Sequence, residues 1–388
     1  MFPRIPTKLA LGPGGVVPIW FDPLSGGMNL NIGAPNGFTQ IQEPTAYSNV
    51  AVGGGWRNGI PQTGNLALVT TGFNNTAMGD DVLTSLTTGN GNSGYGADAM
   101  SALTTGTYNS GCGEGALESL ITGSNNVAFG SGALNSQLGS GSTAVGANAG
   151  LKFNGSNAIF VGLNAGQQIP GGTSVLVIGA DSADTVAVSL TSVTIVGSGS
   201  FNSSGVTTSA SSIVGVGDNV LNAVTTGNEI TAVGSGAGVG LTSASAATLV
   251  GYGSGHALTS GASATMIGSL AGKAVSTAAG VTCLGAGAGN TSTTNDSYMT
   301  LLGYGTIGTG AGAVAIGVDS GGNPASAGAN QIALGTANHQ VYVPGTLRID
   351  TALASTATAG SATLPANPAT FLPINLGGVS YKLAVYNV

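Results

Sequence analysis

Three pairs of neighbouring carboxylates have residue types and spacing that could do chemistry. They are Asp80 with Asp81, Glu114 with Glu118, and Asp181 with Asp184. Glycoside hydrolysis uses two such carboxyl groups, one as an acid and the other as a nucleophile or base. Each pair, however, falls at or after a glycine that recurs along the chain, where a turn is expected to face water. The sequence therefore predicts solvated acids, and we assign no catalytic residue.

The remaining reactive side chains do not form a recognisable site. His256 and His339 are 83 positions apart, and Cys112 and Cys283 sit in apolar contexts that favour buried small hydrophobes over a disulfide. The glycine-rich stretch from residue 234 lacks the Gly-Lys-Ser/Thr of a phosphate-binding loop. We therefore predict no metal and no cofactor.

Composition excludes further classes of protein. Of 388 residues 69 are glycine, 42% are hydrophobic and only 5% are charged, with 14 Asp and Glu against 7 Lys and Arg. This acidic balance disfavours nucleic-acid binding, which needs clustered Lys or Arg. No segment approaches the roughly 20 apolar residues of a spanning helix, so membrane insertion is not expected, and the first residues do not resemble a secretory signal.

A glycine preceded by one or two apolar residues recurs about every 17 positions. We call these glycines anchors, and we count positions in each repeat from them. The expected anchors are Gly79, Gly96, Gly113, Gly130, Gly146, Gly162, Gly179, Gly197, Gly215, Gly234, Gly251, Gly268, Gly285, Gly303, Gly317 and Gly335. Such a fixed period is typical of a solenoid.

Other positions keep step with the anchors in the early repeats. The residues concerned are Asn75, Asn92, Asn109 and Asn126 at position −4; Leu83, Met100, Leu117 and Leu134 at +4; Leu86, Leu103 and Leu120 at +7; and Thr88, Thr105 and Thr122 at +9. Later repeats keep the anchor and lose the Thr-Thr-Gly. In a stack, the asparagines and the threonines would each form a ladder.

Seventeen residues are too few for two packed helices, and β-branched residues before glycine favour strands. The sequence thus predicts an all-β, parallel β-solenoid or β-roll. Each coil would contain a short inward strand ending at the anchor, a glycine turn, a second short strand and a Thr-Gly-Asn return. Sixteen coils spaced by about 4.8 Å would form a rod roughly 75 Å long.

The repeats resemble those of two known families. "NNTAMG", "NNVAFG" and "GSTAVG" are similar to the head repeats of trimeric autotransporter adhesins, a left-handed parallel β-roll assembled as a trimer. The longer phrase "TTGFNNTAMGDDVL…TTG" is similar to the shaft repeats of bacteriophage tail fibres. The homotrimer is implied by the resemblance alone, and whether each coil closes within one chain or across three stays open.

Residues 1–61 differ from the repeats, because they hold eight of the 14 prolines and both tryptophans. We interpret this segment as an extended arm that attaches the chain to a phage tail or head, with a cap of the solenoid as the alternative. The candidate attachment residues are Trp20, Phe21, Trp56 and Arg57. Residues 62–338 would be the shaft.

Residues 339–388 are expected to form a small β tip. Alternation in "FLPINL" and "YKLAVY", joined by Gly377-Gly378, predicts a hairpin. This ending resembles the C-terminal segment of several phage fibre and particle proteins. It could cap the rod, lock the subunits together or touch the host.

These observations lead to one expectation of function with several alternatives. The chain is expected to be a non-enzymatic structural fibre on the exterior of a phage virion, anchored by its N-terminus, that mediates or supports attachment to the host. By the resemblance, a host surface polysaccharide is the expected ligand class. The alternatives are a capsid-decorating or spacer fibre without receptor binding, a glycan-cleaving tailspike and an autotransporter adhesin. A left-handed β-helix acyltransferase fits poorly, because it would show an apolar residue every six positions.

Overall fold

The computed structural model describes most of the chain in several ranges. They are residues 7–10, 16–22, 29–32, 47–53, 56–57, 60–61, 64–186, 189–202, 211–243, 245–277, 279–291, 296–317, 326–335, 370–376 and 379–385. The chain divides into two compact units, Met1–Gln340 and Val341–Val388. The described residues contain strands and turns but no helix.

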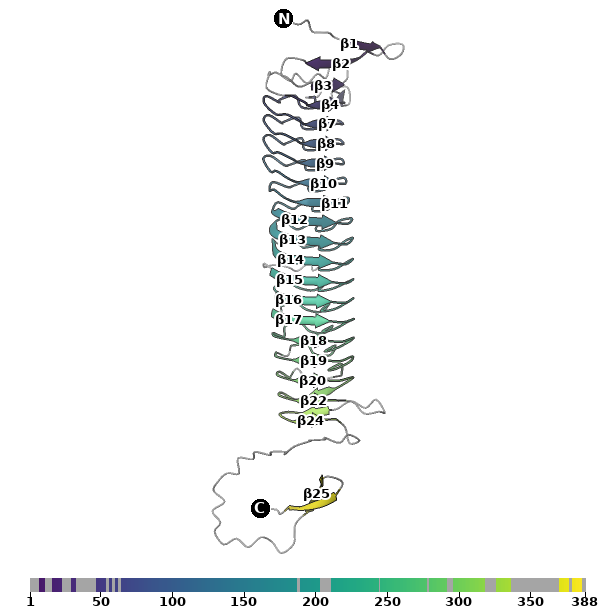
Figure 1. The fold of residues 1–388 in the computed structure, drawn as a ribbon, viewed down its shortest axis with the longest axis vertical. Helices are drawn as coiled ribbons and strands as arrows, with labels where there is room; N and C mark the ends of the chain where they lie inside the picture. The colour runs from purple at the N-terminus through teal and green to yellow at the C-terminus, as the bar shows by residue number, and fades with distance from the viewer. Residues whose placement is uncertain are drawn as a thin grey trace, which may run out of the picture. The chain divides into compact units, whose positions relative to one another are not determined.

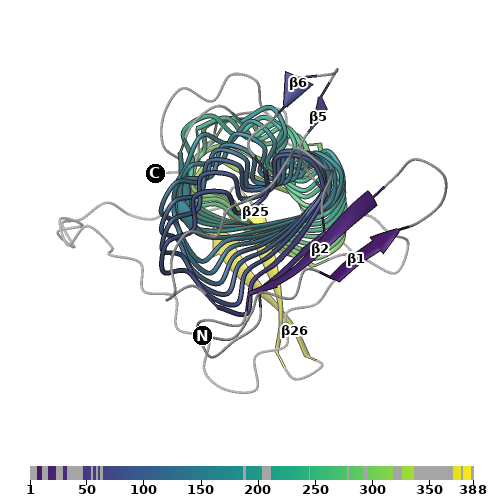
Figure 2. The ribbon, with the colours of Figure 1, turned by 90° about the horizontal axis from the view of Figure 1, so that it is seen from above.

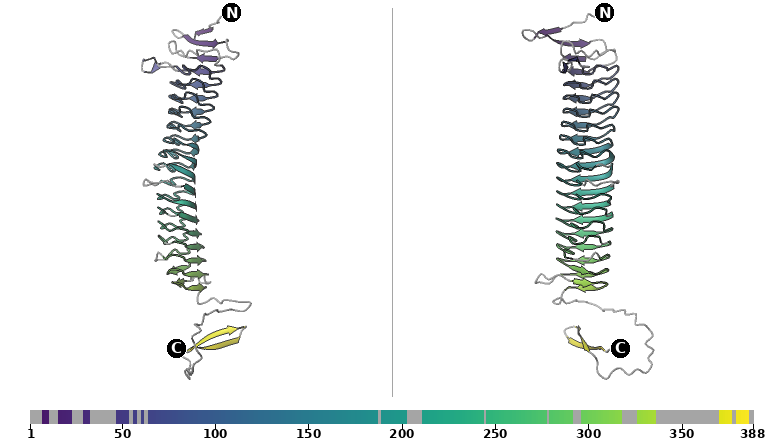
Figure 3. Two further views of the ribbon diagram at one scale, coloured as in Figure 1. Left: turned by 90° about the vertical axis from the view of Figure 1, so that its left-hand side faces the viewer. Right: turned by 180° about the vertical axis from the view of Figure 1, so that it is seen from behind.

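The first unit is a parallel β-solenoid, in which each coil adds one strand to the same sheet (Figures 1 and 3). Its parallel strands, in stacking order, are β3 (Asn29–Ile32), β4 (Val50–Val52), β7 (Thr76–Met78), β8 (Ser93–Tyr95), β9 (Ser110–Cys112), β10 (Val127–Phe129), β11 (Thr143–Val145), β12 (Ser156–Val161), β13 (Gly172–Ile178), β14 (Leu190–Val196), β15 (Ser211–Val216), β16 (Asn228–Val233), β17 (Ser245–Val250), β18 (Thr265–Ile267), β19 (Thr282–Leu284), β20 (Thr300–Leu302), β22 (Val314–Ile316) and β24 (Ile332–Leu334). The predicted fold class and coil length are confirmed.

The strands at the N-terminal end of the stack run differently. β2 (Val16–Asp22) pairs antiparallel with β3, and β1 (Thr7–Ala10) pairs antiparallel with β2. Figure 2 shows β1 and β2 at that end of the stack. β5 (Trp56–Arg57) and β6 (Ile60–Pro61) form a separate antiparallel pair. β1 to β4 lie within residues 1–61 and belong to the same sheet as the strands of the later coils.

The shaft begins earlier than residue 62. Ser48 is left-handed, Asn49 is buried, and a Cβ atom on Gly53 would lie 2.7 Å from the carbonyl oxygen of Gly79. These features recur at the corresponding positions of later coils. Residues 47–53 therefore belong to the first coil, with Gly53 as its anchor.

The second unit contains a described hairpin. β25 (Thr370–Leu376) pairs antiparallel with β26 (Val379–Val385), and Leu376 is opposite Val379. The two-residue connection is Gly377-Gly378, as the alternating apolar pattern predicted.

The anchor glycines are required by the stack itself. From Gly79 to Gly303 their φ values lie between 120° and 143°, where L side chains are strained. A Cβ atom on Gly251 would also lie 2.5 Å from the carbonyl oxygen of Gly268 in the next coil. Neighbouring coils therefore meet at this turn backbone against backbone.

Gly215 is the one anchor that the repeat placed incorrectly. It lies inside β15, is buried, and pairs with Ile195 and Ala232, so it occupies position −2. The turn is made by Gly217, whose φ is 137° and whose amide donates to the Val196 carbonyl at 2.8 Å. This coil is longer than the average repeat. Gly215 therefore lies closer than Gly217 to the position that the period predicts.

Most coils lack the expected second strand. Between the anchor and position +7 the chain instead makes successive turns, with left-handed residues at +2 and +4 such as Asp81 and Leu83. Within the described ranges, β21 (Ile307–Thr309) and β23 (Ser326–Gly328) are the one further pair of parallel strands. A third left-handed residue lies at position −5 in each described coil. Tyr108 precedes its strand, whereas Asn157 lies within β12.

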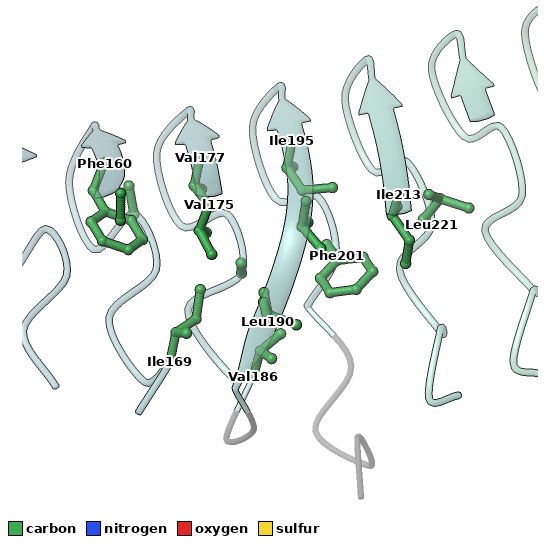
Figure 4. Close-up of a cluster of buried hydrophobic side chains, with 14 of the residues drawn as sticks. Phe160, Ile169, Val175, Val177, Val186, Leu190, Ile195, Phe201, Ile213 and Leu221 are labelled. Carbon is green, nitrogen blue, oxygen red and sulfur yellow. The ribbon is translucent and has the colours of Figure 1, made fainter. Parts of the chain in front are cut away.

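The core consists of rows of side chains from positions −4, −2, +4 and +7 (Figure 4). In several coils the volumes at positions −2 and +4 compensate each other. Ala128 at −2 is accompanied by Leu134 at +4. Leu249 at −2 is accompanied by Gly255 at +4, whose Cβ atom would lie 2.8 Å from the leucine. Ile195 and Phe201 are both large and buried, so this exchange does not hold in every coil.

The predicted asparagine ladder is present. Asn49, Asn75, Asn92, Asn109 and Asn126 are fully buried, and each Nδ2 group after the first donates to the Oδ1 atom of the asparagine before it at 3.0–3.2 Å. Each Nδ2 group also donates to a glycine carbonyl, which is that of Gly106 for Asn92 at 2.9 Å. The ladder thus satisfies buried backbone and side-chain groups together.

The ladder ends at Ser142 and Gln137. The Ser142 amide donates to Asn126 Oδ1 at 3.0 Å, and Gln137 Nε2 donates to the Gly155 carbonyl at 2.9 Å. Gln137 occupies position +7, which is apolar in the neighbouring coils at Leu120 and Phe153. Beyond this junction position −4 is apolar from Ala158 to Ala313, and Gln331 occupies it in the last described coil.

The threonine ladder lies one residue earlier than predicted, at position +8. Thr87 Oγ1 donates to the Thr104 carbonyl at 3.0 Å, and Thr104 Oγ1 donates to the Ile121 carbonyl at 2.9 Å. Thr88 is exposed. The ladder resumes in later coils, where Thr225 and Thr242 make the same bond at 2.9 Å, so those repeats retain this feature.

Candidate functional site

The three carboxylate pairs lie on turns rather than in a shared site. Glu114 is exposed, and Glu118 Oε2 accepts a hydrogen bond from Asn135 Nδ2 of the next coil at 2.7 Å. Asp80 and Asp81 occupy positions +1 and +2 and are half-buried. Each pair belongs to a different part of the stack, so the fold does not bring the pairs together.

Asp184 is a half-buried acid at position +5. Its Oδ1 atom is buried and has no hydrogen-bond partner among the described residues. Burial raises the pKa of its carboxyl group, and the nearby Asp181 carboxylate raises the pKa further. Asp181 itself is exposed and accepts a hydrogen bond from Asn164 Nδ2 at 2.9 Å. Both effects disfavour the ionised form of Asp184.

The cysteines lie on opposite sides of the sheet. Cys283 is buried at position −2, where burial raises its pKa to about 12. Cys112 is at position −1, half-buried and outward, which corrects the expectation that both are core residues. His256 is exposed at position +5, and His339 lies outside the described residues. Among the described residues, no three His, Cys, Asp or Glu side chains are grouped to hold a metal ion.

The candidate attachment residues lie on two separate strands. Trp20 and Phe21 are on β2, where they pair with Asn31 and Leu30. Trp56 and Arg57 are on β5, where they pair with Pro61 and Ile60.

The outer face of the parallel sheet carries two rows of uncharged side chains along the shaft. Residues at position −1 form a row in which each is the register partner of the next. The row is Met78, Tyr95, Cys112, Phe129, Val145, Val161, Ile178, Val196, Val216, Val233, Val250, Ile267, Leu284, Leu302, Ile316 and Leu334. Successive strand residues alternate between the inside and the outside of the coil, so the residues of this row are turned outward. Phe129 is 61% exposed and Leu284 43%.

Position −3 supplies a second outward row beside the first. It is Thr76, Ser93, Ser110, Val127, Thr143, Ile159, Leu176, Thr194, Val214, Thr231, Thr248, Thr265, Thr282, Thr300, Val314 and Ile332. Neither row contains Asp, Glu, Lys, Arg or His. We call the two rows together the uncharged sheet face.

Charges lie elsewhere on the coils. Asp80, Glu114 and Asp218 follow the anchor directly, while Glu118 and Lys273 lie at position +5. Most charged side chains thus lie at the turns. Exposed Glu229 lies at position −5 within β16, whereas positions −1 and −3 of the sheet present uncharged groups alone.

Sequence reasoning missed this face although its signal was present. An apolar residue immediately before each anchor was interpreted as part of an inward strand. Because successive strand residues point to opposite sides, an inward residue at −2 requires an outward one at −1.

Comparison with family models, curated proteins and solved structures found no match to this chain. Within the described ranges, no helix is long and apolar enough to cross a membrane.

Proposed function

We propose that this chain is a non-enzymatic structural fibre on the exterior of a phage virion, where it mediates or supports attachment to the host. The observation that carries the proposal is the solenoid itself. Each coil repeats one strand and one set of turns. The acids among the described residues are distributed over different coils and do not gather at one site. A stack of this kind serves as a rigid spacer, because each coil is stabilised by its neighbours.

The two ends of the fibre would have different roles. Residues 1–61 would dock to phage tail or head proteins, and residues 339–388 would form the outer tip. Three chains per fibre, as the repeat resemblance implies, would present several copies of the tip and raise avidity for a host surface polysaccharide.

Labelling the C-terminus on intact particles tests this arrangement. We expect the label to lie at the outermost point of the appendage, and a label at the particle surface would contradict the polarity.

Incubating the purified chain with host envelope polysaccharide tests the activity. Co-sedimentation without shortening of the polymer is expected. Shortening would identify a glycan-cleaving spike, and absence of binding would leave a capsid-decorating or spacer fibre as the function.

A further inference from the structure

The uncharged sheet face is at the upper end of what an ordinary monomer exposes. Sixteen strands spaced by about 4.8 Å, with two outward rows about 7 Å apart, give an area on the order of 500 Å². The largest apolar patch on a typical monomer measures roughly 300–600 Å². A stable interface buries about 800 Å² per partner, and the two rows alone would supply more than half of that area.

We propose that further copies of this chain cover the uncharged sheet face, so that the fibre assembles with its parallel sheets turned toward one another. This inference rests on the proposed fibre, because it names the surface through which the chains of that fibre meet.

The period of the face is the argument for a second copy as its occupant. A partner must place uncharged groups opposite Phe129, Val233 and Leu284 alike, over a length of roughly 70 Å and with one contact per strand spacing. A second solenoid has this spacing along its whole length. It also brings no charge to the contact, since positions −1 and −3 hold none.

Hydroxyl groups beside the apolar row suit the same occupant. Thr231 and Thr300 are exposed next to the exposed Val233 and Leu302. Threonine hydroxyls can bond to one another across a contact while their methyl groups pack. Charges at the turns, such as Asp218, would remain at the solvated rim, as charged groups do at protein interfaces.

Two double variants with the same added charge test the proposal. Val233→Asp with Ile267→Asp places carboxylates on the face at two coils. Ser235→Asp with Ser269→Asp places them two residues later in the same coils, at exposed positions beyond the anchors. Mass is measured by light scattering, and folding by circular dichroism and thermal unfolding.

The expected masses follow from the 37.1 kDa chain. We expect about 111 kDa for the original chain and for the serine variant, and about 37 kDa for a folded Val233/Ile267 variant. A folded Val233/Ile267 variant that remains at 111 kDa overturns the proposed face but leaves the trimeric fibre standing. A folded original chain at 37 kDa contradicts both.

Native Cys112 supplies a second measurement that does not depend on those variants folding. It lies on the face, whereas Cys283 is buried in the core. Its alkylation by a maleimide is expected to be at least tenfold slower at a concentration where the chain is assembled than after dilution to the monomer, with Cys283 unreactive in both. Equal rates for Cys112 would overturn the proposal.

Discussion

Asn92 illustrates how single residues join the coils. Its Oδ1 atom accepts hydrogen bonds from the amide and the Nδ2 group of Asn109, both at 3.0 Å. Its own Nδ2 group donates to Asn75 Oδ1 at 3.1 Å and to the Gly106 carbonyl at 2.9 Å. One buried side chain therefore satisfies groups from three coils.

Asn92→Ala should destabilise the shaft strongly. The substitution leaves buried donors and acceptors unpaired, and each unsatisfied group costs about 1–3 kcal/mol. We expect a loss of about 3 kcal/mol in the free energy of unfolding, measured by denaturant titration. The matched control Asn135→Ala, at a half-buried surface position, should cost less than about 1 kcal/mol because water replaces its bonds. Equal losses would refute the role of the ladder.

Asp184→Asn should stabilise the protein at neutral pH. A carboxyl group whose pKa is raised on folding disfavours the folded state once the pH rises through its ordinary pKa of 3.8 and beyond. The midpoint of thermal unfolding should therefore be higher in the variant at pH 7, and the difference should shrink toward pH 3. An advantage independent of pH would point to packing instead.

Among the structural elements, the anchor turn determines how closely coils approach. Because the backbones of Gly251 and Gly268 meet there, no side chain can be accommodated. The strand before the turn in contrast carries outward residues of different size at position −1, in a row that runs from Met78 to Leu334. Spacing between coils is thus set at the turn, and surface chemistry is set on the strand.

Gly251→Ala tests this distinction. Strain at a φ of 128° and the close carbonyl of Gly268 should together cost at least about 3 kcal/mol of stability. Gly236→Ala is the control, because Gly236 has a φ of 66° but nothing within 4 Å of the added atom. It should cost only about 1–2 kcal/mol, the ordinary expense of a left-handed alanine. Denaturant unfolding of both variants measures the difference.

For the whole molecule, the N-terminal segment combines two tasks. β3 protects the edge of β4 by pairing with it, while β1 and β2 extend beyond the stack of coils. Attachment can therefore be separated from folding only if the deletion ends before β3.

Removing residues 1–28 makes that separation. This deletion removes Trp20 and Phe21 and leaves β3 in place. Particles carrying the shortened chain should lose the appendage, while the purified chain keeps its circular dichroism spectrum and its assembled mass. Particles that retain the appendage would show that attachment lies elsewhere.

Much of the fold followed from the sequence alone. The 17-residue period, the anchor glycines and the buried asparagines and leucines were predictable, because a repeated coil places identical side chains above one another. Residues at −4 and +7 could be assigned for the same reason, and the apolar alternation of residues 371–376 and 381–386 predicted the terminal hairpin.

Only the tertiary structure decided the register between coils and the exposure of each side of the sheet. Gly217 rather than Gly215 forms the turn, and Thr87 rather than Thr88 carries the ladder, because hydrogen bonds between coils select one position among near equivalents. Leu83 is left-handed because the turns of the stack require it. Sequence patterns identify which residues are apolar, but burial depends on what packs against them, so the uncharged sheet face emerged only when the coils were stacked.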